Sequence, residues 1–129
     1  MKVKTIEVNS LVLAYLGDTV YEGYVRRYLI DKGICNVNDL QKESIKYVSA
    51  VNQAEFLKQM ISESFLSTEE VDIVIRARNY KTTSHPKSCD IITYKYATGF
   101  EAVIGYLYLE DNIERINQLI DYALKLEVK

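Results

Sequence analysis

Two apolar stretches of this chain each carry isolated carboxylates. Residues 11–25, LVLAYLGDTVYEGYV, contain Asp18 and Glu22, and residues 100–109, FEAVIGYLYL, contain Glu101 as their one acid. A carboxylate in so apolar a run is costly unless something pairs with it. Because four residues separate Asp18 from Glu22, a helix would place both on one face. Two apolar helices that each carry an acid suggest carboxylates gathered around a cation.

Asp18 and Glu101 are therefore candidate metal ligands, and Glu22 is a weaker candidate that would support them from beside the metal. Mg²⁺ takes oxygen ligands and keeps several of its waters, so two carboxylates can suffice to hold it. A cation held in this way can neutralise charge on a phosphoryl group in transfer. The alternative is structural: Asp18 could cap a helix or pair with an arginine, and Glu22 could serve only the fold.

A basic segment lies between the two acidic stretches. Residues 76–95 contain five Lys or Arg and one acid, a local charge of +4 on a chain whose net charge is −2. Such a stripe can bind phosphate even on an acidic protein, with a modest salt dependence because few phosphates are contacted. The alternative is an ordinary solvated surface. The candidate RNA-binding residues are Arg76, Arg78, Lys81, His85 and Lys87.

Composition indicates a single folded domain of 129 residues in a reducing compartment. No apolar run approaches the roughly 20 residues of a membrane helix, and the N-terminus lacks the apolar core of a signal peptide. Cys35 and Cys89 lack metal-type spacing and are expected to be free thiols. We therefore expect a cytoplasmic protein. The single histidine excludes a His-rich metal cluster and disfavours a Ser–His–Asp triad.

The hydrophobic pattern predicts an all-α protein without strands. The first helix should begin at Asn9 or Ser10 and end near residue 30, and its Gly17 and Gly23 are expected to allow close approach of another backbone, such as that of a second subunit. Residues 37–60 should form one broken helix or two short ones, with Asn38 as the cap. Ser67 and Glu70 have the spacing of a capping box, which opens a helix that reaches residue 80. Residues 81–89 form a loop, and the last two helices span about 90–109 and 112–126.

These segments together resemble the ribonuclease III catalytic domain, whose signature contains Leu-Gly-Asp, here residues 16–18. The acid-Ala element of that family is similar to FEAVIG at residues 100–105. The order and spacing of LAYLGDTVYEGYVRRYL, VNDLQKESIKYVSAVNQAE, RARNYKTTSHPK and TYKYATGFEAVIGYLYLE resemble the Mini-ribonuclease III subfamily more closely. The resemblance covers about residues 11–123.

The resemblance implies a homodimeric helical endonuclease that cleaves double-stranded RNA with Mg²⁺ and leaves 5′-phosphate and 3′-hydroxyl ends. In this subfamily the task is the trimming of 23S ribosomal RNA precursors. Asp18 and Glu101 carry over as the catalytic metal ligands. Residues 1–129 would be a single catalytic domain without a double-stranded-RNA-binding domain. Residues 81–87 would then hold the RNA, which a ribosomal protein could help to present.

The chain departs from full-length ribonuclease III at two further acidic positions, which correspond here to Ala14 and Thr98. Two carboxylates should hold Mg²⁺ more weakly than four. The Arg-Gly-Arg-Asn that usually opens the basic loop is here residues 76–79, RARN, and a loop glycine is replaced by Thr82 or Thr83. A-form RNA is recognised mostly by shape, so weak sequence preference is expected.

Two other functions fit parts of the pattern. A non-catalytic RNA-binding or ribosome-assembly module on the same fold would bind duplex RNA without cutting it. An all-α, Mg²⁺-dependent nucleotide pyrophosphohydrolase could instead use Glu69, Glu70 and Asp72. Those three acids lie in the first turn of a helix, where acids are favourable without any metal.

Overall fold

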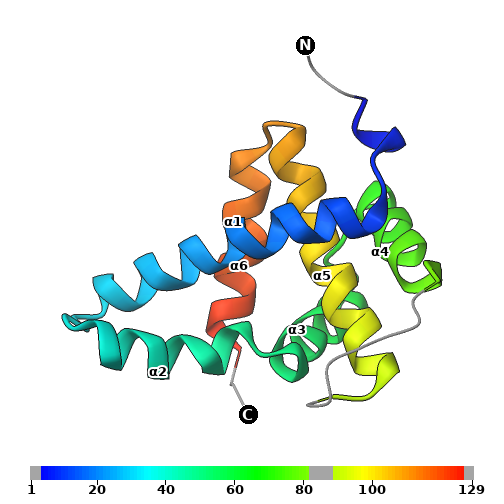
Figure 1. Ribbon diagram of the computed structural model, residues 1–129. Helices are drawn as coiled ribbons and strands as arrows, with labels where there is room; N and C mark the ends of the chain where they lie inside the picture. The colour runs from blue at the N-terminus through cyan, green and yellow to red at the C-terminus, as the bar shows by residue number, and fades with distance from the viewer. Residues whose placement is uncertain (1–3, 82–88, 127–129) are drawn as a thin grey trace.

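Every regular element in the described residues, 4–81 and 89–126 of a computed structural model, is a helix (Figure 1). The all-α prediction is therefore confirmed. Cys35 and Cys89 are free thiols, as expected. No helix in these ranges is both long and apolar enough to cross a membrane. The elements are η1 (Thr5–Glu7), α1 (Ser10–Asp31), α2 (Val37–Val48), α3 (Ala50–Ser62), α4 (Thr68–Asn79), α5 (Ile91–Leu109) and α6 (Ile113–Lys125).

Polar side chains cap the start of each α-helix. The side chain of Ser49 accepts a hydrogen bond from the backbone of Asn52, so the predicted break in residues 37–60 falls at Ser49, between α2 and α3. The predicted cap at Asn38 is wrong: Asn36 is the N-cap, since its side chain reaches the backbone N–H three residues on. The predicted capping box of α4 is present. The N-caps are Asn9, Asn36, Ser49, Ser67, Asp90 and Asn112.

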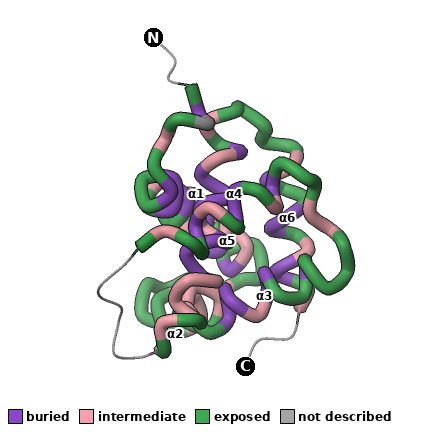
Figure 2. The backbone as a smooth tube through the Cα atoms, turned by 90° about the vertical axis from the view of Figure 1, so that its right-hand side faces the viewer, coloured by how far each residue is buried: buried purple, intermediate pink, exposed green. Residues whose placement is uncertain are grey.

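Helix α5 is the centre of the fold. It packs against α1, α3, α4 and α6, and its residues 97–105 are all buried except Glu101, which is half-buried. Figure 1 shows α1 crossing α5, with α2 folded back beneath α1. The buried segments in Figure 2 gather where α1, α3, α4 and α5 meet. There the ring of Tyr21 meets Phe100 edge-on, with 4.9 Å between ring centroids, and Phe56 packs on the other side of Phe100.

Glycines allow the backbones of α1 and α5 to touch where they cross. A Cβ on Gly17 would overlap the carbonyl oxygen of Glu101, and one on Gly105 would overlap the carbonyl oxygen of Leu13. Gly23, in contrast, has open space around its Cβ position. The sequence predicted close approach of another backbone at Gly17 and Gly23. This is confirmed for Gly17, whose partner is α5 of the same chain, and not for Gly23.

Candidate functional site

The glycine crossing brings Asp18 and Glu101 together. Asp18 follows Gly17 on α1, and Glu101 supplies the very carbonyl against which Gly17 packs. The two side-chain carboxyl groups are hydrogen-bonded to each other. Asp18 is exposed and Glu101 is half-buried, so the pair lies at the protein surface with one oxygen-rich edge open to solvent.

Two carboxyl groups in contact cannot both be ionised cheaply. Burial, the hydrogen bond and charge of Asp18, and the charge of Glu22 raise the pKa of Glu101 to about 9. A hydrogen bond from Gln53 opposes this rise. At neutral pH and without a cation, this raised pKa favours the protonated form of Glu101. A divalent cation could replace that proton and relieve the repulsion.

Glu22 lies one helical turn after Asp18, on the same face of α1, as its spacing predicted. It is half-buried and forms an ion pair with Arg26 at 3.1 Å. Its carboxylate thus adds negative potential near Glu101 while it already has a cationic partner. This arrangement suits a supporting residue better than a direct metal ligand.

The oxygen donors at this site fit a hard divalent cation, but they are few. Within the described ranges, no group of three or more His, Cys, Asp or Glu side chains is placed to share a metal ion. Ala14 and Thr98, the positions of the two missing acids, are both buried. The Thr98 hydroxyl donates to the carbonyl of Tyr94 at 2.9 Å and is thereby satisfied within its own helix. Asp18 and Glu101 are left as the acidic pair.

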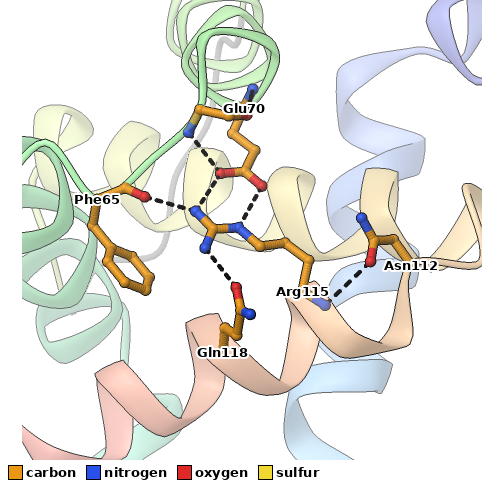
Figure 3. A network of polar contacts seen from close by, with 6 residues as sticks. Phe65, Glu70, Asn112, Arg115 and Gln118 are labelled. Carbon is orange, nitrogen blue, oxygen red and sulfur yellow. Dashed lines mark hydrogen bonds and ion pairs between the residues drawn. The ribbon is translucent and has the colours of Figure 1, made fainter.

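In the second acidic cluster, at the start of α4, Glu70 is committed to the fold, while Glu69 and Asp72 are exposed. The side chain of Glu70 is only 4% exposed and accepts two hydrogen bonds of 2.9 Å from Arg115 (Figure 3). Arg115 also donates to the carbonyl of Phe65 at 2.6 Å, and Ser67 donates its backbone N–H to Glu70. Burial alone would raise the pKa of Glu70, but these hydrogen bonds outweigh it and the pKa is lowered. Because Glu70 is paired with Arg115, it is not free to bind a metal ion, and this weakens the hypothesis of a pyrophosphohydrolase that uses Glu69, Glu70 and Asp72.

The basic residues named from the sequence separate into two environments. Arg76 is half-buried and donates to the carbonyl of Val8 at 3.0 Å, against the N-terminal segment. Arg78 is exposed, with its guanidinium 5.1 Å from the ring centre of Tyr96. Residues two apart on a helix project about 200° apart, so this divergence was expected. Lys81 is exposed, while His85 and Lys87 lie outside the described residues.

Sequence reasoning missed Lys58 and Tyr96 as members of the basic surface. The Lys58 ammonium lies 5.1 Å from the centre of the Tyr96 ring, which Arg78 also contacts. Because α3 and α5 pair Gln53 with Glu101 and Lys58 with Tyr96, the helices run antiparallel. Five residues on each helix then separate this basic cluster from the carboxyl pair, about 7.5 Å along the helix axes. No local signal marks Lys58, since only the tertiary fold brings it there.

Most of this chain is similar in sequence to a known protein family and to curated proteins. Residues 11–112 match the family model described as the Ribonuclease III domain. A curated protein of Streptococcus pneumoniae, named Mini-ribonuclease 3, is 42% identical over 118 residues, which cover 92% of each chain. A protein of the same name from Brevibacillus brevis is 46% identical over 118 residues, 92% of this chain and 87% of its own.

A solved structure is similar over nearly the whole length. The crystal structure of a protein from Fusobacterium nucleatum superimposes with a TM-score of 0.84 at 36% sequence identity, and the match covers 95% of this chain and 98% of that one. The residues matched by the family model include Gly17, Asp18, Gln53 and Glu101.

Proposed function

Since the chain belongs to the ribonuclease III family and is therefore an endoribonuclease, we propose that it cuts double-stranded RNA with Mg²⁺ held by Asp18 and Glu101. The observation that supports this most is the carboxyl pair at the α1–α5 crossing, where the side chains of Asp18 and Glu101 are hydrogen-bonded to each other. Its all-oxygen donors match what Mg²⁺ prefers. We further propose that residues 1–129 form a single catalytic domain.

The residues of the chain have distinct tasks in this proposal. When bound, Mg²⁺ supplies electrostatic stabilisation of the phosphate and activation of water for hydrolysis. Glu101 releases its proton as the metal binds, and Asp18 offers oxygens from the exposed side of the pair. The fixed crossing of α1 and α5 keeps both carboxylates in place. No side chain is required as a general base, and the products carry 5′-phosphate and 3′-hydroxyl ends.

The RNA backbone is held by the basic surface beside the carboxyl pair. Lys58 and Arg78 both contact the ring of Tyr96, and both are exposed to solvent. Tyr96 lies on α5, the helix that also carries Glu101. Lys81, which is also exposed, would extend this surface, and the proposed RNA contacts of His85 and Lys87 lie outside the described residues. Arg76, bonded to the carbonyl of Val8, would contribute through another face. The substrate proposed is precursor 23S ribosomal RNA in the cytoplasm, with a ribosomal protein that presents it as a further proposal.

Loss of either cation on this surface should weaken RNA binding without changing metal affinity. Lys58→Ala and Arg78→Ala should each lower affinity for a duplex regardless of its sequence. Each should also reduce the slope of log K against log salt concentration by about 1. Binding is measured by fluorescence anisotropy over a salt series in EDTA. Lys125→Ala, an exposed lysine of α6, is the control and should keep the wild-type slope; equal effects at all three positions would contradict the assignment.

The working form in this proposal is a homodimer, and an uncovered apolar face supports it. None of the twelve residues of α2, all of them described, is buried in the single chain. Ile45 is 63% exposed, and Tyr15 on α1 is 81% exposed. A groove of about 510 Å³ runs between the two helices. It is lined by Glu22, Arg26, Ile30, Val37, Leu40, Gln41, Ser44, Ile45 and Val48.

A charge in this groove should separate the two copies. Ile45→Glu is expected to raise the dimer dissociation constant at least about tenfold, because burial of an unpaired carboxylate is costly. Cleavage should fall in step with the dimer population. Sedimentation equilibrium measures the association. Ile113→Glu, the same substitution at an exposed isoleucine of α6, should leave a dimer. A wild-type protein that sediments as a monomer at all concentrations would refute the homodimer.

The function itself is tested by incubating the purified protein with labelled duplex RNA, with and without Mg²⁺. Single-stranded RNA and duplex DNA of the same sequence serve as controls. Mg²⁺-dependent cuts confined to duplex RNA, with 5′-phosphate ends, are the expected result. Duplex binding without any cutting would favour the non-catalytic RNA-binding module. Precursor 23S ribosomal RNA as substrate then tests the finer assignment by the position of the cuts.

A further inference from the structure

Side chains satisfy the last three backbone carbonyls of α2. The amide of Asn52 donates to the carbonyl of Lys46 at 2.6 Å, and the hydroxyl of Tyr21 donates to that of Tyr47 at 2.9 Å. Nε2 of Gln53 donates to the carbonyl of Val48 at 2.9 Å. The last backbone carbonyls of a helix have no hydrogen-bond partner within the helix itself, so each of these side chains supplies one of the missing donors. Gln53 is thus anchored firmly by one end of its amide.

The rest of the Gln53 amide has no such structural explanation. The side chain is only 2% exposed, and within the described ranges its Oε1 is buried without a hydrogen-bond partner. A buried acceptor left unpaired is destabilising, because it has lost its hydrogen bond to water and gained none in the protein. The same amide group hydrogen-bonds to the carboxyl group of Glu101. A polar group is therefore retained, at some cost in stability, in direct contact with one member of the carboxyl pair.

We propose that Gln53 is a positioning residue that fixes the orientation of the Glu101 carboxylate for the divalent metal ion. The inference rests on the proposed function, since it assigns a buried residue that orients one ligand of the proposed metal site. The bond to the carbonyl of Val48 holds the amide plane, and the remaining N–H is then directed at Glu101. The carboxylate can rotate less freely, so its outer oxygen faces the gap shared with Asp18. In a site with two acids, the orientation of each matters more than in a site with four.

A purely structural role for Gln53 predicts different behaviour. As a cap of α2 alone, Gln53 would be equivalent to Asn52, which caps the carbonyl of Lys46, two residues before Val48, and belongs to the same turn of α3. Asn52→Ala is therefore the matched control. It removes a cap of the same helix end without removing the group that contacts Glu101.

The test compares Gln53→Leu with Asn52→Ala in Mg²⁺ binding, measured by calorimetry without RNA. Gln53→Leu should weaken Mg²⁺ binding about 10- to 100-fold, the usual effect of removing a group that orients a metal ligand. Asn52→Ala should bind Mg²⁺ as the wild type does, although its melting temperature falls. Cleavage by Gln53→Leu should recover when Mg²⁺ is raised in the same proportion. Wild-type Mg²⁺ affinity in Gln53→Leu would overturn the proposal.

A second measurement uses the wild-type protein and does not depend on whether Gln53→Leu folds. Mg²⁺ is titrated while the side-chain amide signals of Gln53 and Asn52 are followed by NMR. The Gln53 signals should shift in proportion to saturation, and those of Asn52 should not. Unchanged Gln53 signals at saturating Mg²⁺ would overturn the inference alone, because the metal has bound. A wild type that neither binds Mg²⁺ nor cuts duplex RNA would instead overturn the proposed function.

Discussion

Asp18→Asn and Glu101→Gln should each lower the rate of duplex cleavage by at least about 10²–10³-fold, as loss of one group that stabilises the transition state commonly does. Both substitutions keep the size of the side chain and remove the negative charge that would hold the metal. Glu101→Gln can also keep a hydrogen bond to Asp18, so the fold should be preserved. Affinity for duplex RNA in EDTA should stay within about threefold, because phosphate contacts come from the basic residues.

Single-turnover kinetics measures the cleavage rate of these variants, and fluorescence anisotropy in EDTA measures their affinity for duplex RNA. Glu69→Gln is the matched control, since Glu69 is an exposed acid of the α4 cluster and is expected to be dispensable. If Glu69→Gln were inactive and Asp18→Asn active, the metal would have to lie at α4. Weak RNA binding in Asp18→Asn would show instead that the substitution had disturbed the RNA surface.

Gly17→Ala should destabilise the protein by about 3 kcal/mol or more, at the upper end of overpacking effects. The added Cβ would overlap backbone atoms of Glu101, which cannot move aside as a flexible side chain could. Helix α1 would have to shift from α5, and Asp18 would move with it. The carboxyl pair should therefore separate in whatever fraction remains folded, and cleavage by that fraction should also fall.

Gly23→Ala provides the comparison within the same helix. No atom of the described part of the chain lies within 4 Å of its Cβ position, so the change should stabilise the helix by up to ~1 kcal/mol through propensity. Urea denaturation of the two variants gives the free energies of unfolding. Equal and small effects would mean that α1 and α5 do not touch at Gly17. A large loss at Gly23 would point to a partner copy packed against that position.

The sequence alone predicted the helices because they depend on local pattern, and it marked Asp18 and Glu101 because each is an isolated acid in an apolar run. Apolar periodicity and the Ser67–Glu70 spacing placed α4 and its capping box correctly. Gly17 in an apolar helix correctly indicated close approach of a backbone, though not which one. Position along the chain could not decide that Asp18 is exposed while Glu101 is half-buried, because burial depends on how α1 crosses α5.

Three contacts that the sequence did not predict join residues distant along the chain. Arg115 pairs with Glu70, 45 residues earlier, and no rule of spacing connects them. Lys58 reaches the ring of Tyr96 only because α3 runs beside α5. In the sequence, nothing distinguishes Gln53 from other polar residues of an amphipathic helix. Only the fold places its amide between the end of α2 and Glu101. Such residues tend to be found by packing and hydrogen bonding, not by composition.

Calorimetric titration of the wild type with Mg²⁺, in two buffers of different ionisation enthalpy, tests the metal site most directly. The buffer dependence of the heat gives the number of protons released. At pH 7 we predict release of about one proton per site, because the pKa of Glu101 is raised to about 9 and its proton must leave before the metal can bind. Mg²⁺ affinity should rise with pH up to that value and be lost in Asp18→Asn. Binding without proton release, or with unchanged affinity in Asp18→Asn, would contradict a metal site built on Asp18 and Glu101.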